Sequence, residues 1–291
     1  MTKSKLNLLF PFLCLFLSLS FPAACASGVK NGLSISIGSA LPALFPSLVL
    51  SSLLTGQKSF LQNKRFLLPY VLGLFCGFPV GASTVATLVR EGEISAKDGE
   101  KLLFFCNNAS PAFLISYCGG VILKNPKLGL FLYLMQCALS TLCLFFCFGR
   151  RLFSKEPKKQ KDRNFIHSKA LDFPSALKNG MNSFIYIMSC MIFFSFLSEL
   201  IRTLFSLNRY AFSVVGSFLE LCGGLKLLHH FQPKFLFPLC ALACGWGGLS
   251  VHLQTAGILE ESKIGIKSHV LGKLFFSVTL CAFALFLQKL L

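Results

Sequence analysis

The chain carries the stretch Gly73-Leu-Phe-Cys-Gly77-Phe-Pro79-Val-Gly81-Ala-Ser-Thr84 and, about one membrane thickness of chain later, Asn107-Asn-Ala-Ser-Pro111. Both put helix-breaking residues and uncharged hydrogen-bonding side chains inside hydrocarbon-rich sequence. An unpaired peptide group in lipid is strongly unfavourable, so irregular backbone survives in a membrane only where protein covers it or where it lines a polar cavity. The two stretches therefore predict the inside of a translocation pathway.

The composition is that of an integral membrane protein. Of the 291 residues, 54% are hydrophobic and 33 are Phe, and the mean hydropathy is +0.68. This length holds about six to nine inserted segments of roughly 20 residues each. We therefore predict a single integral membrane domain over residues 1–291, an all-α polytopic helical bundle with two re-entrant or interrupted hairpins and broken helices.

The net charge of +17 would indicate nucleic-acid binding in a soluble protein. In a membrane protein, basic residues gather in cytoplasmic loops and meet anionic lipid headgroups, so we expect membrane lipids as partners and no nucleic acid. Residues 150–178 carry nine Lys or Arg against three acidic residues. They predict a cytoplasmic basic loop.

The N-terminus has two interpretations. Lys3 and Lys5 precede an apolar run from Leu6 to Phe21 and then Ala24-Cys-Ala26, which are the parts of a secretory signal peptide. An uncleaved first membrane segment fits as well. We favour the uncleaved segment, because the rest of the chain is itself membrane-inserted.

The thirteen cysteines lie almost entirely in apolar runs and form no C-x-x-C pair. Neutral thiols behave as small hydrophobes in such helices. We therefore expect no metal site and no cofactor. No Ser/His/Asp, metal or nucleotide motif is visible either, so we expect that the protein is not an enzyme.

The sequence predicts where the membrane segments begin and where they break. Ser95 and Asp98 resemble a capping box, so a helix should begin at Ala96. The spacing of Gly73, Gly77 and Gly81 is that of a small-residue ridge against which another helix packs. Whether residues 35–55 and 210–225 cross the membrane stays open. The residues expected to break helices are Gly77, Pro79, Gly81, Pro111, Gly247 and Gly248.

Two pairs of landmarks recur at nearly equal offsets, Ser47 with Ser217 and Ser83 with Ser250. They indicate an internal repeat with halves at residues 35–149 and 208–291, and whether the halves are inverted depends on whether 35–55 and 210–225 cross the membrane. Interrupted segments at corresponding positions of two halves point to a transporter binding site between the halves.

Uncharged polar residues near the breaks are the candidate substrate ligands. Asn amides could donate to a carboxylate or only repair carbonyls freed by Pro111, and the hydroxyls could bind solute or only cap half-helices. His252 is either a ligand or a neutral side chain bonded to backbone. The candidates are Ser83, Thr84, Asn107, Asn108, Ser110, Ser250, His252 and Gln254.

Glu220 is the acid well inside an apolar stretch. An acid inside a membrane predicts a coupling or gating site for H⁺ or Na⁺, whereas at the membrane surface it would be solvated. Taking Glu220 as the only charged side chain at depth, we expect that half-helix ends and neutral donors recognise an anion without a buried Lys or Arg.

The order of motifs resembles that of the YlbJ-type sporulation integral membrane proteins over roughly residues 30 to 275. That family is similar to the gate domains of concentrative nucleoside transporters, whose sites lie between two re-entrant hairpins and two broken helices. Ser110 departs mildly from the pattern, where Gly is frequent, and family members commonly run longer at the C-terminus. The motifs are Leu41-Pro-Ala-Leu-Phe-Pro46-Ser, Gly77-Phe-Pro-Val-Gly-Ala82, Asn107-Asn-Ala-Ser-Pro-Ala-Phe113, Glu220-Leu-Cys-Gly-Gly224 and Gly247-Gly-Leu-Ser-Val-His252-Leu-Gln254.

The resemblance implies movement of dipicolinate during spore formation. We therefore expect a multi-pass permease for a small anionic or heteroaromatic solute in a bacterial cell membrane, the mother-cell or outer forespore membrane in a sporulating cell. A coupling ion and a homo-oligomer are further expected partners. A nucleoside or nucleobase permease and a non-transporting sporulation scaffold remain alternatives. The direction of transport and its energy source stay open.

Overall fold

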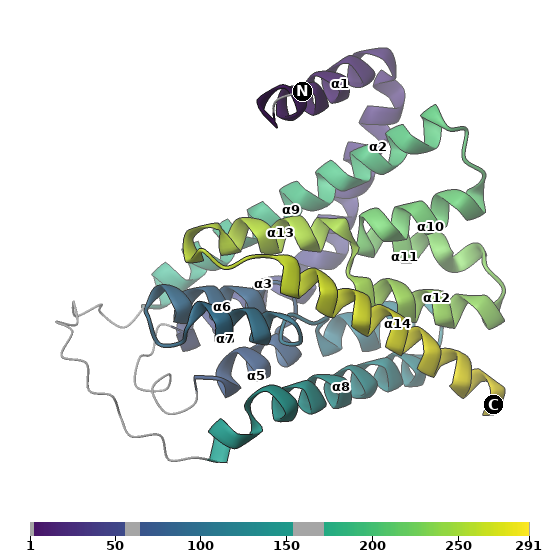
Figure 1. Ribbon diagram of the computed structural model, residues 1–291. Coiled ribbons are helices and arrows are strands. Elements are labelled where there is room, and N and C mark those ends of the chain that lie inside the picture. The colour runs from purple at the N-terminus through teal and green to yellow at the C-terminus, as the bar shows by residue number, and fades with distance from the viewer. Residues whose placement is uncertain (1–2, 56–64, 154–171, 291) are drawn as a thin grey trace.

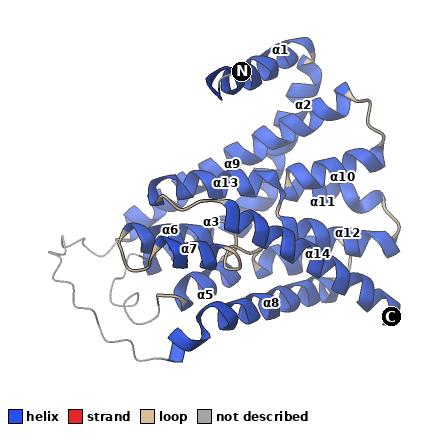
Figure 2. Ribbon diagram, in the orientation of Figure 1, coloured by secondary structure: helices blue, strands red, loops and turns tan. Residues whose placement is uncertain are grey.

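The computed structural model describes residues 3–55, 65–153 and 172–290, and within these ranges it contains helices and loops but no strand (Figure 2). This confirms the predicted all-helical membrane bundle. Five helical stretches are long and apolar enough to cross a membrane, namely Pro22–Leu54, Pro126–Arg151, Phe173–Leu204, Pro233–Ser262 and Lys267–Lys289.

The N-terminal part consists of α1 (Lys3–Ser20) and a nearly continuous helical rod of α2 (Pro22–Ile35), η1 (Ser36–Ala40) and α3 (Leu41–Thr55). The apolar run 35–55 is therefore the second part of a longer helix, and that helix is long enough to span. Gly28 and Gly32 on α2 pack against the backbone of α9 (Phe173–Leu204). Small residues allow this close approach of two helices.

A short helical hairpin and an interrupted helix follow. The helices α5 (Leu67–Phe75) and α6 (Val80–Arg90) fold back on each other. The chain continues through α7 (Ala96–Leu103), an irregular stretch at 104–111, the π-helical η2 (Ala112–Ile122) and the long α8 (Pro126–Phe153). The Ser95 side chain accepts a hydrogen bond from the Asp98 N–H at 3.1 Å, so the predicted start of α7 at Ala96 is confirmed.

The same order of elements occurs after α9. The helices α10 (Arg209–Leu219) and α11 (Leu221–Leu227) form a second hairpin, which ends in η3 (Leu228–His230). An interrupted helix follows as α12 (Pro233–Trp246) and α13 (Gly248–Leu259), then η4 (Glu260–Ser262) and α14 (Lys267–Leu290). The segment 210–225, whose crossing of the membrane the sequence left open, thus contains parts of two antiparallel helices.

In the bundle, each hairpin packs against the interrupted helix of the other set (Figure 1). Helix α6 of the first hairpin packs against α13, and α11 of the second hairpin packs against η2. Gly77 lies at the turn of the first hairpin, so by the order of elements its counterpart is Glu220 at the turn of the second hairpin. Gly247 lies instead at the interruption of a helix, so it is not the counterpart of Gly77. The residue pairing expected from the sequence therefore differs from the order of elements, while each of the halves 35–149 and 208–291 contains one set.

Two of the predicted backbone roles need correction. Gly81 does not break a helix, because it lies in the first turn of α6. Gly73 and Gly81 lie on opposite arms of the hairpin, so they form no ridge along one helix. Both face the backbone of Cys106 instead. The close approach is real, but its partner is irregular backbone.

Two ion pairs lie at the end of the bundle where α6 and α8 end. Arg90 at the end of α6 bonds to Glu261 at 2.8 Å, and Arg151 near the end of α8 bonds to Asp98 at 2.9 Å. The predicted cytoplasmic loop 150–178 begins at this end. Its central residues 154–171 lie outside the described residues.

Candidate functional site

The breaks in the helices meet in the middle of the protein. Gly77 has φ +80° and packs against Ser110 in the irregular stretch 104–111. Gly248 also has φ +80°, and it packs against the backbone at Glu220, where α10 ends. Glycine adopts these positive φ angles without a steric penalty. Each hairpin thus rests on the interruption of the following helix.

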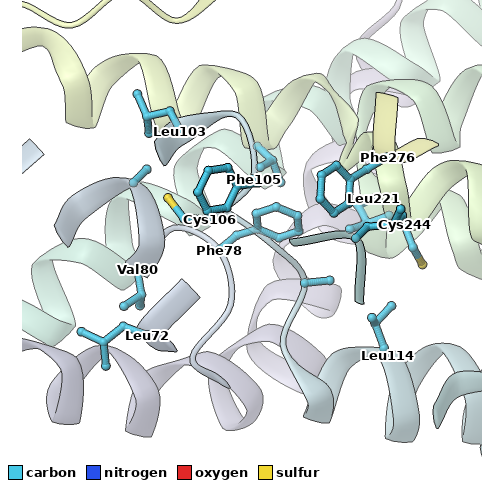
Figure 3. Packing of buried hydrophobic residues seen from close by; sticks show 14 of the residues in the cluster. Leu72, Phe78, Val80, Leu103, Phe105, Cys106, Leu114, Leu221, Cys244 and Phe276 are labelled. Carbon is cyan, nitrogen blue, oxygen red and sulfur yellow. The ribbon is translucent and has the colours of Figure 1, made fainter. Parts of the chain in front are cut away.

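Phe78 links the two pairs of breaks. Its Cζ lies 3.4 Å from the position that a Cβ on Gly247 would take. Figure 3 shows the Phe78 ring between Cys106 of the first irregular stretch and Phe276 and Leu221 of the second set of elements. The first hairpin therefore reaches the second interrupted helix directly.

Asn107 joins the first hairpin to α13. Its Oδ1 accepts a hydrogen bond from the Ala82 N–H at 3.4 Å, and its Nδ2 donates to Thr255 Oγ1 at 3.1 Å. The side chain is fully buried. Asn107 thus touches the first turn of α6 and the second interrupted helix at once.

Asn108 forms hydrogen bonds both to the irregular backbone and to the side chain of Lys273. Its Nδ2 donates to the Phe105 carbonyl at 2.6 Å and to Ser140 Oγ at 2.9 Å. Its Oδ1 accepts from Lys273 Nζ at 3.3 Å. The amide donors expected to face a solute are therefore used inside the protein, and the carbonyl oxygen faces the site.

Gln136 on α8 was not predicted from the sequence. Its Nε2 donates to the Ala109 carbonyl at 2.9 Å and its Oε1 accepts from the Ala109 N–H at 3.2 Å. An unpaired buried peptide group is unfavourable, so Gln136 stands in for the helical bonds that Ala109 lacks. The break does not depend on Pro111 alone, because α7 already ends at Leu103 and Pro111 occupies the N-cap of η2.

Lys273 on α14 corrects the prediction of a site without a buried cation. Its side chain is only 1% exposed. The ammonium lies over the rings of Phe78 and Phe276, 4.8 and 5.4 Å from their centroids. Glu220 is therefore not the only charged side chain at depth. The signal in the sequence was an ionisable residue within an apolar helix, one turn after His269.

Two histidines flank Lys273. His269 is fully buried and His252 is 6% exposed, with ring centroids 5.1 Å apart. Within the described residues none of their ring nitrogens makes a hydrogen bond of good geometry, although the backbone of Trp246 approaches His252 and that of Leu103 approaches His269. The indole of Trp246 lies on the other side of His252, at 4.2 Å between centroids. His252 was predicted from the sequence, whereas His269 was not.

The other predicted ligands are divided. Ser250 and Gln254 are buried on α13, and Ser250 Oγ has no hydrogen-bond partner in the part of the chain that the structure describes. Thr84 is buried, and its hydroxyl donates to the Val80 carbonyl. Ser110 Oγ accepts from the Phe113 N–H in the first turn of η2 at 3.2 Å. Ser83 lies on the exposed side of α6 and does not join the buried cluster.

Glu220 is 3% exposed and caps α11. Its carboxylate accepts hydrogen bonds from the backbone N–H groups of Cys222 at 3.0 Å and Gly223 at 2.6 Å. An acidic group is favourable at a helix N-terminus. A capping role therefore stands beside the predicted coupling role.

The comparisons with known proteins agree with the motif order. The sequence is 24% identical over 357 aligned residues to the sporulation integral membrane protein YlbJ of Bacillus subtilis (strain 168), and the match covers 99% of this chain and 85% of YlbJ. The chain is a distant relative of YlbJ. This confirms the YlbJ-type assignment, and with the apolar helices it supports a membrane location. No protein-family model and no solved structure matches the chain.

Proposed function

We propose that the protein is a multi-pass permease that moves a small anionic or heteroaromatic solute, and that this solute is dipicolinate during spore formation. The observation that carries the proposal is the meeting of two helix breaks around buried polar side chains. Asn107 and Asn108 are fully buried there, yet together they contact α6, α8, α13 and α14. Such irregular, polar backbone inside apolar helices is typical of transporter sites.

The comparison with YlbJ supports the sporulation context of the proposal. The membrane would be the mother-cell or outer forespore membrane. Glu220, beside both the α10/α11 turn and Gly248, is the residue that we propose for coupling to H⁺ or Na⁺. Catalysis is not part of the proposed role.

The proposal needs the site to open. Asn107, Asn108 and Lys273 are at most 1% exposed, so a solute reaches them only when a hairpin moves from its interrupted helix.

Uptake into proteoliposomes tests the proposal. Purified protein should accumulate labelled dipicolinate above the level of protein-free vesicles, and unlabelled dipicolinate should compete. Uptake of uridine in place of dipicolinate would favour the nucleoside permease. Uptake of neither solute, under H⁺ and Na⁺ gradients in both directions, would favour a sporulation scaffold.

A further inference from the structure

Lys273 is a buried basic side chain that meets only neutral partners among the described residues. Its one hydrogen bond goes to the neutral Oδ1 of Asn108 at 3.3 Å. None of the ion pairs in the described part of the chain includes it. A buried charge without a counter-charge is strongly unfavourable, and two of the three ammonium donors remain unused.

The two histidines extend the unused polar surface. His269 precedes Lys273 by one turn of α14, so both side chains lie on one face of that helix. His252 reaches the same place from α13. Buried polar atoms in proteins are nearly always hydrogen-bonded, and each exception needs an explanation. Among the described residues, four of the six unsatisfied buried atoms belong to His252 and His269 beside Lys273, while Ser198 on α9 is one of the others, and this concentration favours a ligand site.

The walls of the cluster are aromatic. Phe78 and Phe276 lie beside the Lys273 ammonium, and Trp246 lies against His252. Aromatic rings favour stacked or edge-to-face contact with another flat ring. A ligand that combines a carboxylate with an aromatic ring therefore matches both the charge and the walls.

We propose that Lys273, His252 and His269 form the subsite that binds a carboxylate group of an aromatic solute. This inference rests on the proposed permease function and names the residues that set its substrate class. The carboxylate supplies the counter-charge that Lys273 lacks and accepts hydrogen bonds from the free ammonium donors. Asn108 holds the ammonium from the opposite side, while the solute ring packs against the aromatic walls.

Binding to the purified full chain in detergent tests the subsite. Isothermal titration with dipicolinate, benzoate and benzyl alcohol compares two carboxylates with an uncharged ring. We expect Lys273→Met to weaken dipicolinate binding by about ten- to a hundredfold, the range for a lost hydrogen bond to a charged group. Lys267→Met removes a charge from the exposed start of the same helix and should leave binding unchanged. Equal affinity in wild type and Lys273→Met would overturn the subsite.

A second measurement does not depend on the variant folding. Dipicolinate and benzoate should raise the unfolding temperature of the wild type, whereas benzyl alcohol should not. Equal stabilisation by benzyl alcohol would count against recognition of a carboxylate. Lys273→Met itself should unfold at the same or a higher temperature without ligand, because it removes an unpaired buried charge.

Uptake separates the subsite from the permease function. If wild type and Lys273→Met move dipicolinate equally, the permease stands and the subsite falls. If wild type binds dipicolinate through Lys273 but does not move it, the subsite stands and the permease falls. If wild type neither binds nor moves an aromatic carboxylate, both fall.

Discussion

The α-carbon of Gly73 packs directly against the carbonyl oxygen of Cys106, and a methyl group on Gly73 would overlap this oxygen. The first hairpin and the irregular stretch of the following helix are therefore in backbone contact. We expect Gly73→Ala to lower the free energy of unfolding by about 1–3 kcal/mol, the usual cost of overpacking, as measured by thermal unfolding in detergent. Gly38→Ala is the control, because a methyl group at Gly38 meets open space. Equal unfolding temperatures would show that the contact yields easily.

Gln136→Leu should destabilise the protein by about 1–3 kcal/mol for each buried group left unpaired. The substitution removes both hydrogen bonds to Ala109 and leaves its N–H and carbonyl without these partners. Gln288→Leu removes a single bond from an exposed glutamine to the Pro233 carbonyl, so it should have a smaller effect. Thermal unfolding of both variants makes the comparison. A larger loss in Gln288→Leu would contradict the role given to Gln136.

Asn108→Ala should reduce dipicolinate uptake by about tenfold, on the scale of a lost hydrogen bond to a charged group. The substitution takes away the oxygen that holds the Lys273 ammonium. The Phe105 carbonyl keeps a donor in Ser140, which limits the loss of stability. Asn125→Ala, in an exposed turn, is the control. Unchanged uptake at equal membrane abundance would limit Asn108 to repair of the backbone.

Glu220→Gln should alter the H⁺ or Na⁺ dependence of uptake. The amide keeps an oxygen that can accept from one backbone N–H of α11, but it loses the charge and one of the two acceptors. We expect a stability loss of about 1 kcal/mol, as for other N-cap changes. Uptake measured across imposed ion gradients is the decisive readout. A lower unfolding temperature with an unchanged ion profile would leave Glu220 as a cap alone.

Cysteine labelling should assign the two ends of the bundle to the two sides of the membrane. Lys97 and Lys263 lie in exposed positions near the ion-paired end, which we expect in the cytoplasm because of its basic residues. Lys127 lies at the other end of α8, whose 28 residues measure about 42 Å at 1.5 Å per residue. In a background without reactive native cysteines, an impermeant thiol reagent should label Lys127→Cys in intact cells. It should label Lys97→Cys and Lys263→Cys only after lysis. The reverse pattern would invert the topology.

The sequence predicted the breaks at Pro79, at Asn107 to Pro111 and at Gly247 because Gly and Pro restrict the backbone locally. It did not predict the α10/α11 turn, where Glu220 takes extended φ and ψ angles of −136° and 123°. No proline marks that turn. Gly224 allows the two arms of this hairpin to approach closely, because it packs against Ser217 of the other arm. A contact between two arms depends on tertiary packing, which local sequence does not reveal.

The candidate site was predicted only in part for a related reason. Asn107 and Asn108 stand out by their type in an apolar run, whereas Lys273 lies six residues into α14, where a cation near a membrane surface is ordinary. Its burial depends on Phe78 and Asn108, which come from elements far away in the sequence. The role of Gln136 was not predicted for the same reason. It bonds to the backbone of Ala109, and the type of that residue gives no sign of a polar partner.

Phe78 joins the first hairpin to α14 and to the second interrupted helix. One ring covers both the Lys273 ammonium and the Gly247 turn, so any displacement of the first hairpin that uncovers the cation also frees the second interrupted helix to rearrange. The Phe78 ring therefore couples the position of the first hairpin to that of the second interrupted helix. Replacing it with a smaller side chain would separate the two contacts, and in the permease that we propose this change should increase leakage of solute.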